Sequence, residues 1–211
     1  MQGLVPCAET NITTLTTTNM FTGIIKNLGK LSEITETKLT IETDADFVDE
    51  LDRGASVAID GICLTVVNQD KNLFTVEVMP ETVNRTNLKS LQPGSLVNLE
   101  MPAMPESFLA GHIVQGHVDG VAQLQSIAEQ GNSHVLKFSI PESISKYIVE
   151  KGSVAINGVS LTVIEAGNDY FTVGIIPHTW DTTMFHTFKA KDVVNIEVDV
   201  LAKYVEKLMN R

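Results

Sequence analysis

From Met20 onward, apolar side chains occur in short runs bounded by turn-forming residues rather than at the regular spacing of long helices. The runs richest in β-branched residues occupy 57–59, 64–67 and 74–78. Asp60-Gly61 and Pro93-Gly94 mark turns, and Asp60-Gly61 suits a tight hairpin whose central residues need positive φ. Many short strands with little helix predict an all-β fold, and closure into a small barrel removes the exposed sheet edges.

Two kinds of helix are expected beside the strands. Residues 46–51 place Phe47 and Leu51 at i and i+4, which predicts one short helix in this part of the chain. The end of the chain, 200–209, carries a clearer helical stripe. Its apolar positions at i, i+3, i+4 and i+7 are Leu201, Tyr204, Val205 and Leu208. We expect this stripe to dock on the parent barrel or on a neighbouring subunit.

The chain contains nearly the same module twice. Ser56 to Val66 returns 97 positions later as Ser153 to Val163, and the same shift maps 97–100 onto 194–197. Between Ser56 and Glu100, 17 of 45 positions are identical without a gap, against about 3 expected by chance from ordinary composition. The repeat also carries the short helix, because Ile144 and Ile148 keep its i,i+4 spacing. The repeat predicts two similar domains of about 95 residues each.

Composition limits the classes of function. The 211 residues include 26 acidic and 15 basic side chains, which gives a formal net charge of −11 and argues against nucleic-acid or anionic-membrane partners. No apolar run approaches the ~20 residues of a bilayer span, so we expect a soluble protein. Cys7 and Cys63 lie far apart without metal or disulfide spacing, and a reduced cytoplasmic compartment is the expectation. Residues 1–19, with six threonines and no lysine or arginine, are interpreted as a disordered leader.

Differences between the modules indicate candidate chemistry. Cys63 and Ser160 occupy equivalent positions, so one module offers a thiol where the other offers a hydroxyl, although a buried packing role for Cys63 stays open. His112 and His117 lie in a glycine-bounded segment between the modules, but no carboxylate or cysteine cluster completes a metal site. A Ser160, His112 and Asp199 hydrolase is disfavoured, because the Gly-x-Ser-x-Gly elbow is missing.

These motifs, in this order, resemble the riboflavin synthase family from Met20 to the C-terminal helix. The matching segments are 20–25, 61–66, 79–82, 111–120, 158–163, 176–179 and 195–199. The resemblance implies two similar antiparallel Greek-key-type β-barrels in tandem, followed by a C-terminal α-helix through which three chains associate. It divides the chain into a leader at 1–19, an N-terminal lumazine-binding barrel at 20–110, a C-terminal lumazine-binding barrel at 111–198 and an oligomerisation helix at 199–211.

The reaction implied by the resemblance is the dismutation of two molecules of 6,7-dimethyl-8-ribityllumazine. One molecule gives a four-carbon unit to the other, which yields riboflavin and 5-amino-6-(D-ribitylamino)uracil without a cofactor or a metal. The sites then form between the N-terminal barrel of one subunit and the C-terminal barrel of another in a homotrimer. Two similar pockets suit two identical substrate molecules.

The resemblance also assigns residues. The catalytic positions that it implies are Cys63, Ser160, Thr162, His112 and Asp199. His112 would assist proton transfer, and Asp199 would orient or polarise across the interface. The implied substrate-binding positions are Phe21, Gly23, Ile24, Ile25, Cys63, Leu64, Thr65, Glu77, Val78, Met79, Pro80, Glu81, Thr82, Gly116, His117, Val118, Lys151, Ser160, Leu161, Thr162, Gly174, Ile175, Ile176, Pro177, His178 and Thr179.

One position departs from the family pattern, and one alternative function shares the same fold. Asn157 stands where many relatives are acidic, with Asp60 in the other copy, so neither receives a proton-transfer role. The alternative function is a lumazine- or flavin-binding antenna protein, which shares the duplicated barrel and catalyses nothing. Antenna proteins typically lose the features that this chain keeps as Cys63, His112 and His117.

Overall fold

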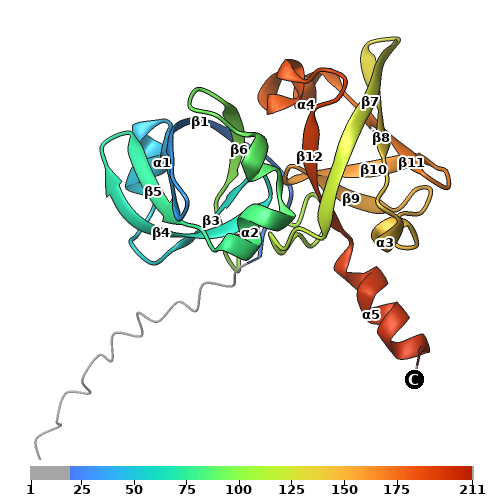
Figure 1. The fold of residues 1–211 in the computed structure, drawn as a ribbon, viewed down its shortest axis with the longest axis horizontal. Helices are drawn as coiled ribbons and strands as arrows, with labels where there is room; N and C mark the ends of the chain where they lie inside the picture. The colour runs from blue at the N-terminus through green and yellow to red at the C-terminus, as the bar shows by residue number, and fades with distance from the viewer. Residues whose placement is uncertain (1–19, 211) are drawn as a thin grey trace, which may run out of the picture.

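The computed structural model describes residues 20–210 and contains two closed antiparallel barrels of six strands each (Figure 1). The barrels lie side by side, the first drawn in blue to green and the second in yellow to red. The all-β prediction of two tandem barrels is confirmed. The predicted leader at 1–19 and Arg211 lie outside the described residues.

Three strands of the first barrel coincide with the predicted runs of β-branched residues, and three others were not predicted. Its strands are β1 (Asn27–Ile34), β2 (Lys38–Glu42), β3 (Ser56–Ile59), β4 (Ile62–Asp70), β5 (Leu73–Glu77) and β6 (Leu96–Glu100), in the spatial order β1-β2-β5-β4-β3-β6. Alternate residues point into the barrel, as the burial of Leu39 and Ile41 on β2 and of Phe74 and Val76 on β5 shows.

The second barrel has the same topology. Its strands are β7 (Gly120–Gln130), β8 (Ser133–Ser139), β9 (Ser153–Ile156), β10 (Val159–Ala166), β11 (Tyr170–Ile175) and β12 (Val193–Val198). In both barrels the hairpin between the third and fourth strands turns at an Asx-Gly pair. Asp60 and Asn157 have φ of 47° and 44°, which confirms the tight turn predicted from the sequence.

Each module contains more helix than we predicted. The expected helices are present as α1 (Ala45–Asp49) and α3 (Glu142–Ser145), but each module adds two further short helices. These are α2 (Pro80–Arg85) and η1 (Asn87–Ser90) in the first module, and α4 (Pro177–Thr182) and η2 (Met184–Thr187) in the second. The prediction of one helix per module was wrong, because segments of one or two turns are too short to show a helical period.

The repeat shift changes at the start of each module. Leu39 and Leu136 are buried equivalents at the shift of 97, but Leu31 and Leu124 occupy equivalent positions at a shift of 93. Four extra residues in the hairpin of β7 and β8 account for the difference, and both strands are longer than β1 and β2. Gly23 and Gly116, with φ of 75° and 77°, are therefore the equivalent glycines ahead of the two barrels.

Buried asparagines join the barrels around an approximate two-fold axis. Asn98 at the end of the first barrel accepts a hydrogen bond from Met184 N at 2.9 Å, and Asn195 at the end of the second accepts one from Asn87 N at 2.7 Å. Each of these two side chains also donates to the other barrel's hairpin, to the carbonyl of Asn157 or of Asp60, at 2.9 Å. The amide side chains satisfy backbone groups that the contact takes out of water.

The two hairpin turns meet at this axis. A Cβ atom added to Gly61 would lie 2.6 Å from Gly158 N, so only glycine permits the approach. Beside it, Asp60 is fully buried, accepts from Asn98 N at 2.8 Å, and takes part in none of the ion pairs found within residues 20–210. Burial raises the pKa of Asp60 to about 7, against the lowering effect of its hydrogen bonds.

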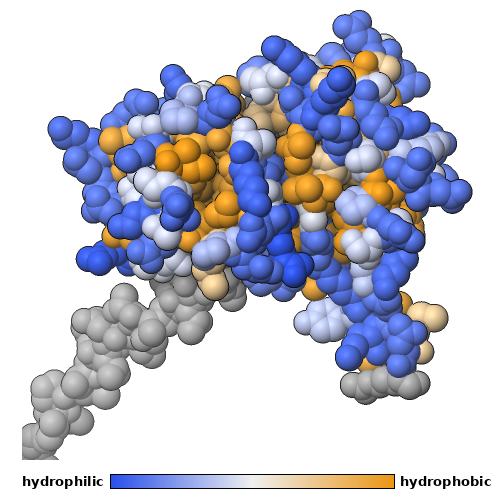
Figure 2. Space-filling view, viewed as in Figure 1, coloured by the Kyte–Doolittle hydropathy of each residue, from blue (hydrophilic) through white to orange (hydrophobic). Residues whose placement is uncertain are grey.

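The C-terminal helix α5 (Val200–Met209) projects away from both barrels (Figure 1). Asp199 caps it by accepting from Leu201 N at 3.0 Å, and Glu206 binds Lys146 and Tyr147 on the second barrel. The predicted apolar stripe remains exposed, with Leu201, Tyr204, Val205 and Leu208 between 55% and 63% accessible. The face of α5 that is visible in Figure 2 is mostly hydrophilic. Within this chain the stripe therefore does not dock on its own barrel.

Within residues 20–210, no helix has the length and apolar character needed to cross a bilayer.

The raised pKa of Asp60 makes stability depend on pH. The folded state binds the Asp60 carboxyl proton more tightly than the unfolded state does. The protonated side chain therefore stabilises the fold below pH ~4, and this stabilisation is lost as the pH rises towards 7. Asp60→Asn removes the titration, and Asn157 shows that an amide fits the equivalent turn. We expect the free energy of unfolding of Asp60→Asn to rise relative to that of wild type as the pH rises, by about 2–4 kcal/mol at pH 8.

Urea denaturation at intervals from pH 4 to pH 8 measures this difference. Asp70→Asn, at an exposed position on the same strand-turn unit, is the control and should leave the pH dependence of stability unchanged. A difference between Asp60→Asn and wild type that stays constant across the pH range would contradict the prediction.

Candidate functional site

Two equivalent hairpins carry the thiol and the hydroxyl that distinguish the modules. Cys63 lies on β4 opposite Ala58, and Ser160 lies on β10 opposite Ala155. Both side chains are partly accessible, while the leucines that follow them, Leu64 and Leu161, point into the barrels. Strand alternation thus presents the reactive groups on the outer surface of each barrel.

A segment from the opposite module crosses each hairpin. Residues 21–25 lead into the first barrel, and residues 114–118 lead into the second; the two segments pair through an antiparallel bridge between Phe21 and Val114. Phe21 N donates to Val114 O at 2.7 Å, and Val114 N donates to Phe21 O at 3.1 Å. We call these two stretches the crossing segments.

The crossing segments reach over to the partner barrels at their glycines. Ser160 N donates to Gly23 O at 2.8 Å, and Cys63 N donates to Gly116 O at 2.9 Å. A Cβ atom on Gly116 would lie 2.5 Å from Cys63 Cβ, and one on Gly23 would lie 2.6 Å from Ser160 Cβ. Each candidate site therefore combines a hairpin of one barrel with a crossing segment that belongs to the other.

At the second hairpin, His112 meets Ser160. The distance from His112 Nδ1 to Ser160 Oγ is 2.7 Å, and Gly111 leaves room for this contact, because a Cβ there would lie 2.9 Å from the hydroxyl. Burial lowers the pKa of His112, although the charge of Asp199 opposes the shift. A neutral imidazole can exchange the Nδ1 proton with Ser160, so the pair can carry a proton to or from a bound molecule.

The thiol of Cys63 has a different environment. Burial raises its pKa, a hydrogen bond with Ser56 lowers it, and the charge of Glu197 raises it. The thiol is therefore predominantly protonated at neutral pH. The outer end of this site is flanked by exposed His117 on the crossing segment, where the other site has exposed Ile24.

The predicted segments 77–82 and 174–179 lie at equivalent places, where β5 leads into α2 and β11 leads into α4. Pro80 and Pro177 begin α2 and α4, and the residues before them, Met79 and Ile176, are 70% and 57% exposed. Each offers apolar surface that a flat ring can cover. Trp180 on α4 stacks on the His134 ring at 3.8 Å between centroids.

The structure places the other predicted residues unevenly. Thr65 and Thr162 are exposed on their strands, two residues beyond Cys63 and Ser160. Lys151 is exposed and its backbone N–H donates to Val163 O at 2.9 Å, beside the second hairpin. Phe21, in contrast, is fully buried among Ala58, Val114 and Ala155 on the axis between the barrels.

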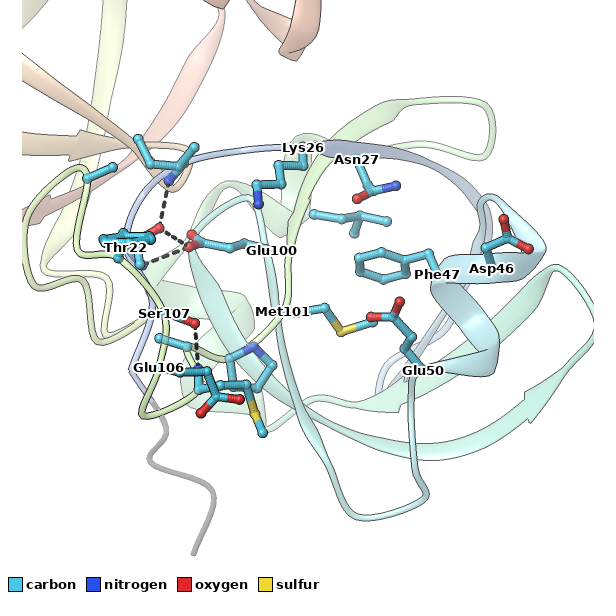
Figure 3. Close-up of a pocket in the computed structure, with 17 residues that line it drawn as sticks. Thr22, Lys26, Asn27, Asp46, Phe47, Glu50, Glu100, Met101, Glu106 and Ser107 are labelled. Carbon is cyan, nitrogen blue, oxygen red and sulfur yellow. Dashed lines mark hydrogen bonds between the residues drawn. The ribbon is translucent and has the colours of Figure 1, made fainter. Parts of the chain in front are cut away.

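A cavity of about 730 Å³ opens beside the first barrel (Figure 3). Of the predicted substrate-binding residues, only Ile24 lines it. Its charged lining consists of Lys26, Asp46, Glu50, Glu100 and Glu106. Cys63 and Ser160 do not line this cavity, but it borders the first crossing segment, because Thr22, Ile24 and Glu100 belong to its lining.

Sequence reasoning missed Glu100 and Glu197, which bind the crossing segments directly. Glu197 accepts from Gly116 N at 2.9 Å, and Glu100 accepts from Gly23 N at 3.0 Å. The signal that could have found them was present, since both end the repeated Val-Asn-x-Glu stretch at 97–100 and 194–197.

Known proteins share both the sequence and the arrangement. Residues 22–102 and 115–199 each match the family described as "Lumazine binding domain". The chain is 42% identical over 198 residues to riboflavin synthase of Mycobacterium tuberculosis, covering 90% of this chain and 98% of that protein. It is 39% identical over 196 residues to riboflavin synthase of Bacillus subtilis, covering 91% of each chain.

A solved structure of LumP complexed with riboflavin superposes with a TM-score of 0.78 at 26% identity, covering 84% of this chain and 98% of that one. With the duplicated barrels and the paired family match, the chain is a member of the lumazine-binding domain family. Within it, the identity to curated enzymes over nine-tenths of the chain assigns it to the riboflavin synthases.

Proposed function

We propose that the chain catalyses the dismutation of two molecules of 6,7-dimethyl-8-ribityllumazine into riboflavin and 5-amino-6-(D-ribitylamino)uracil. The observation that carries the proposal is the pair of equivalent sites that retain a thiol at Cys63 and a Ser160–His112 pair. Similar sites suit identical substrates, and different reactive groups suit the different roles of donor and acceptor. The identity to riboflavin synthases supports the same reaction.

The chemistry starts at the C7 methyl group of lumazine, which is acidic because its carbanion delocalises into the ring. A base removes that proton while a nucleophile adds at C7 of the partner molecule. One molecule then gives its four-carbon unit to the other and the nucleophile is released, because the two products together contain all the atoms of the two substrates. His112, neutral and bound to Ser160, suits the proton transfer. Holding the two rings in register supplies a further part of the rate, since orientation alone can be worth about 7–11 kcal/mol.

Cys63, Ser160 and Thr162 would line the reacting centres, and Asp199 would orient or polarise across the interface. Substrate contacts are proposed for both hairpins, both crossing segments, the segments 77–82 and 174–179, and Lys151. Because Phe21 is fully buried, its proposed part is to support the crossing segments beneath the ring. The proposal needs no cofactor, because the donor and acceptor are the same compound.

The alternative is an antenna protein that binds lumazine or flavin without turnover. LumP shares the fold, as its complexes with riboflavin and with 6,7-dimethyl-8-(1'-D-ribityl) lumazine show, but at 26% and 24% identity. The riboflavin synthases lie closer, at 39% and 42%. The enzyme is therefore the function better supported.

Incubating the purified chain with 6,7-dimethyl-8-ribityllumazine and following riboflavin by its absorbance and fluorescence tests the proposal. We expect catalytic formation of one riboflavin for every two lumazines consumed. Tight lumazine binding without any riboflavin would establish the antenna function instead.

Cys63→Ser tests whether the thiol takes part in the reaction. The change is nearly isosteric and reproduces the residue at the equivalent position in the second barrel, so the fold and ligand binding should persist. If the thiol acts at the reacting centre, single-turnover rates should fall about 10-fold or more, which corresponds to about 1.4 kcal/mol of barrier. Ser160→Ala is the matched variant in the other site. Wild-type rates in Cys63→Ser would assign Cys63 to packing alone.

We propose a homotrimer that assembles through α5 and places the second-barrel site of one subunit against the first-barrel site of another. The exposed stripe on α5 supports this, because burying each such side chain is worth about 1.5–3 kcal/mol. We propose that the first barrel domain spans 20–110, the second barrel domain spans 111–198 and the oligomerisation helix spans 199–211. The cytoplasm is the proposed location, where Cys63 remains reduced.

Deleting the residues after Asp199 should convert the trimer to monomers and lower turnover, because the reacting pair of sites would no longer meet. Sedimentation velocity and the riboflavin assay measure the two effects. As a milder variant, Leu201→Glu with Leu208→Glu keeps the helix length and should also dissociate the subunits. A trimer that survives both changes would refute the role of α5.

A further inference from the structure

Two buried glutamates hold the crossing segments in place. At the end of β12, Glu197 Oε1 accepts from Gln115 N at 2.6 Å, while its Oε2 accepts from Gly116 N at 2.9 Å and from His117 N at 3.0 Å. Three consecutive backbone donors thus converge on one carboxylate. The contact fixes the stretch whose carbonyl, on Gly116, receives the Cys63 N–H.

The first barrel repeats the arrangement with Glu100 at the end of β6. Its Oε1 accepts from Thr22 N and from Thr22 Oγ1, both at 2.7 Å (Figure 3). Its Oε2 accepts from Gly23 N at 3.0 Å. The carbonyl of Gly23 then receives the Ser160 N–H. In both modules a glutamate carboxylate thus accepts hydrogen bonds from a crossing segment, although the two crossing segments differ in sequence.

Backbone donors that converge on both oxygens of each side chain favour the ionised carboxylate. Glu100 and Glu197 are 8% and 3% exposed, and no ion pair within residues 20–210 includes either one. Burial raises the pKa of both. The Thr22 hydroxyl and backbone N–H groups lower the pKa of Glu100, and backbone N–H groups and the charge of Lys203 lower that of Glu197. A carboxylate offers acceptors alone, whereas an amide would turn a donor towards one of the N–H groups. Charge-assisted hydrogen bonds of this kind are the strong ones.

We propose that Glu197 and Glu100 are positioning residues, each of which sets the crossing segment that completes the candidate site on the opposite barrel. Glu197 of the second barrel holds 115–117 over the Cys63 site, and Glu100 of the first barrel holds 22–23 over the Ser160 site. The inference deepens the proposed function, on which its statement about ligand binding rests. Its statement about the segments themselves stands on the hydrogen bonds alone.

Because each glutamate holds the segment over a different site, its substitution should affect only that site. Weakening Glu197 should loosen the cover of Cys63 and leave the Ser160 site intact, although Glu197 lies in the barrel that carries Ser160. Weakening Glu100 should do the opposite. A general loss of stability would affect both sites together, so the pattern separates positioning from a purely structural role.

Alkylation of Cys63 by iodoacetamide, followed by peptide mass mapping, measures the first effect without any ligand. Mapping separates Cys63 from Cys7. The variants are Glu197→Asp, which keeps the charge but shortens the side chain, and Glu197→Gln, with Glu100→Asp and Glu100→Gln as matched controls. Rates are compared on the plateau above the thiol pKa, because the charge of Glu197 itself raises that pKa.

Both Glu197 variants should raise the plateau rate at least about tenfold, the factor expected when a charge-assisted hydrogen bond to the segment is lost. Both Glu100 variants should keep the wild-type rate. Equal rates in the two sets, or a wild-type rate in Glu197→Asp and Glu197→Gln, would overturn the proposal. Loss of the far-UV circular dichroism spectrum in the Glu197 variants would also overturn it, since it would make Glu197 a residue needed for the fold.

Trp180 reports on the other site. It is the single tryptophan of the chain and follows Thr179, a proposed substrate contact of the second barrel. Titration with riboflavin should quench Trp180 in wild type and in the Glu197 variants with similar affinity, but about tenfold more weakly in the Glu100 variants. Equal affinity in all variants would remove the claim about Glu100.

The two hypotheses fail in different ways. If wild type forms no riboflavin while the alkylation pattern holds, the proposed function fails and the positioning role of Glu197 stands. If riboflavin forms at full rate in every variant and Cys63 alkylation is unchanged, the positioning role fails and the proposed function stands.

Discussion

The hydrogen-bonded contact between the barrels is the constraint on which the sites depend. Asn98 and Asn195 each bind backbone groups of the opposite module, and the two hairpins touch where Gly61 meets Gly158. Polar contacts of this kind have a defined direction and distance, whereas an apolar contact tolerates sliding. They fix the relative placement of the barrels closely enough for Gly116 to reach Cys63 and for Gly23 to reach Ser160.

Because of this contact, each barrel is covered by a crossing segment that belongs to the other module. A crossing segment leaves each barrel, pairs with its counterpart at Phe21 and Val114, and covers the reactive strand of the other barrel. Neither module therefore contains a complete candidate site. The duplication supplies two sites with one backbone, and substitutions such as Cys63 for Ser160 then give them different chemistry without altering the frame.

Buried carboxyl groups sustain the arrangement at an energetic cost. Asp60, Glu100 and Glu197 are all buried without an ion pair within residues 20–210, and burial raises the pKa of each. Glu100 and Glu197 offset the cost with several backbone donors each. Asp60 has fewer, and the amide at Asn157 performs the equivalent task without a charge. Carboxylates are retained at the two places where backbone donors converge.

The sequence by itself determined the duplication, three of the six strands in each module, the Asx-Gly hairpins and the terminal helix, because these depend on local periodicity and turn chemistry. It also placed the family through motifs in a fixed order. Only the tertiary structure decided what depends on contacts between distant residues, such as Gln115 with Glu197, which are 82 positions apart. The exchange of crossing segments and the burial of Phe21 leave no local pattern in the sequence. They arise when two folded barrels meet, and the positions that satisfy the contact are set by three-dimensional proximity.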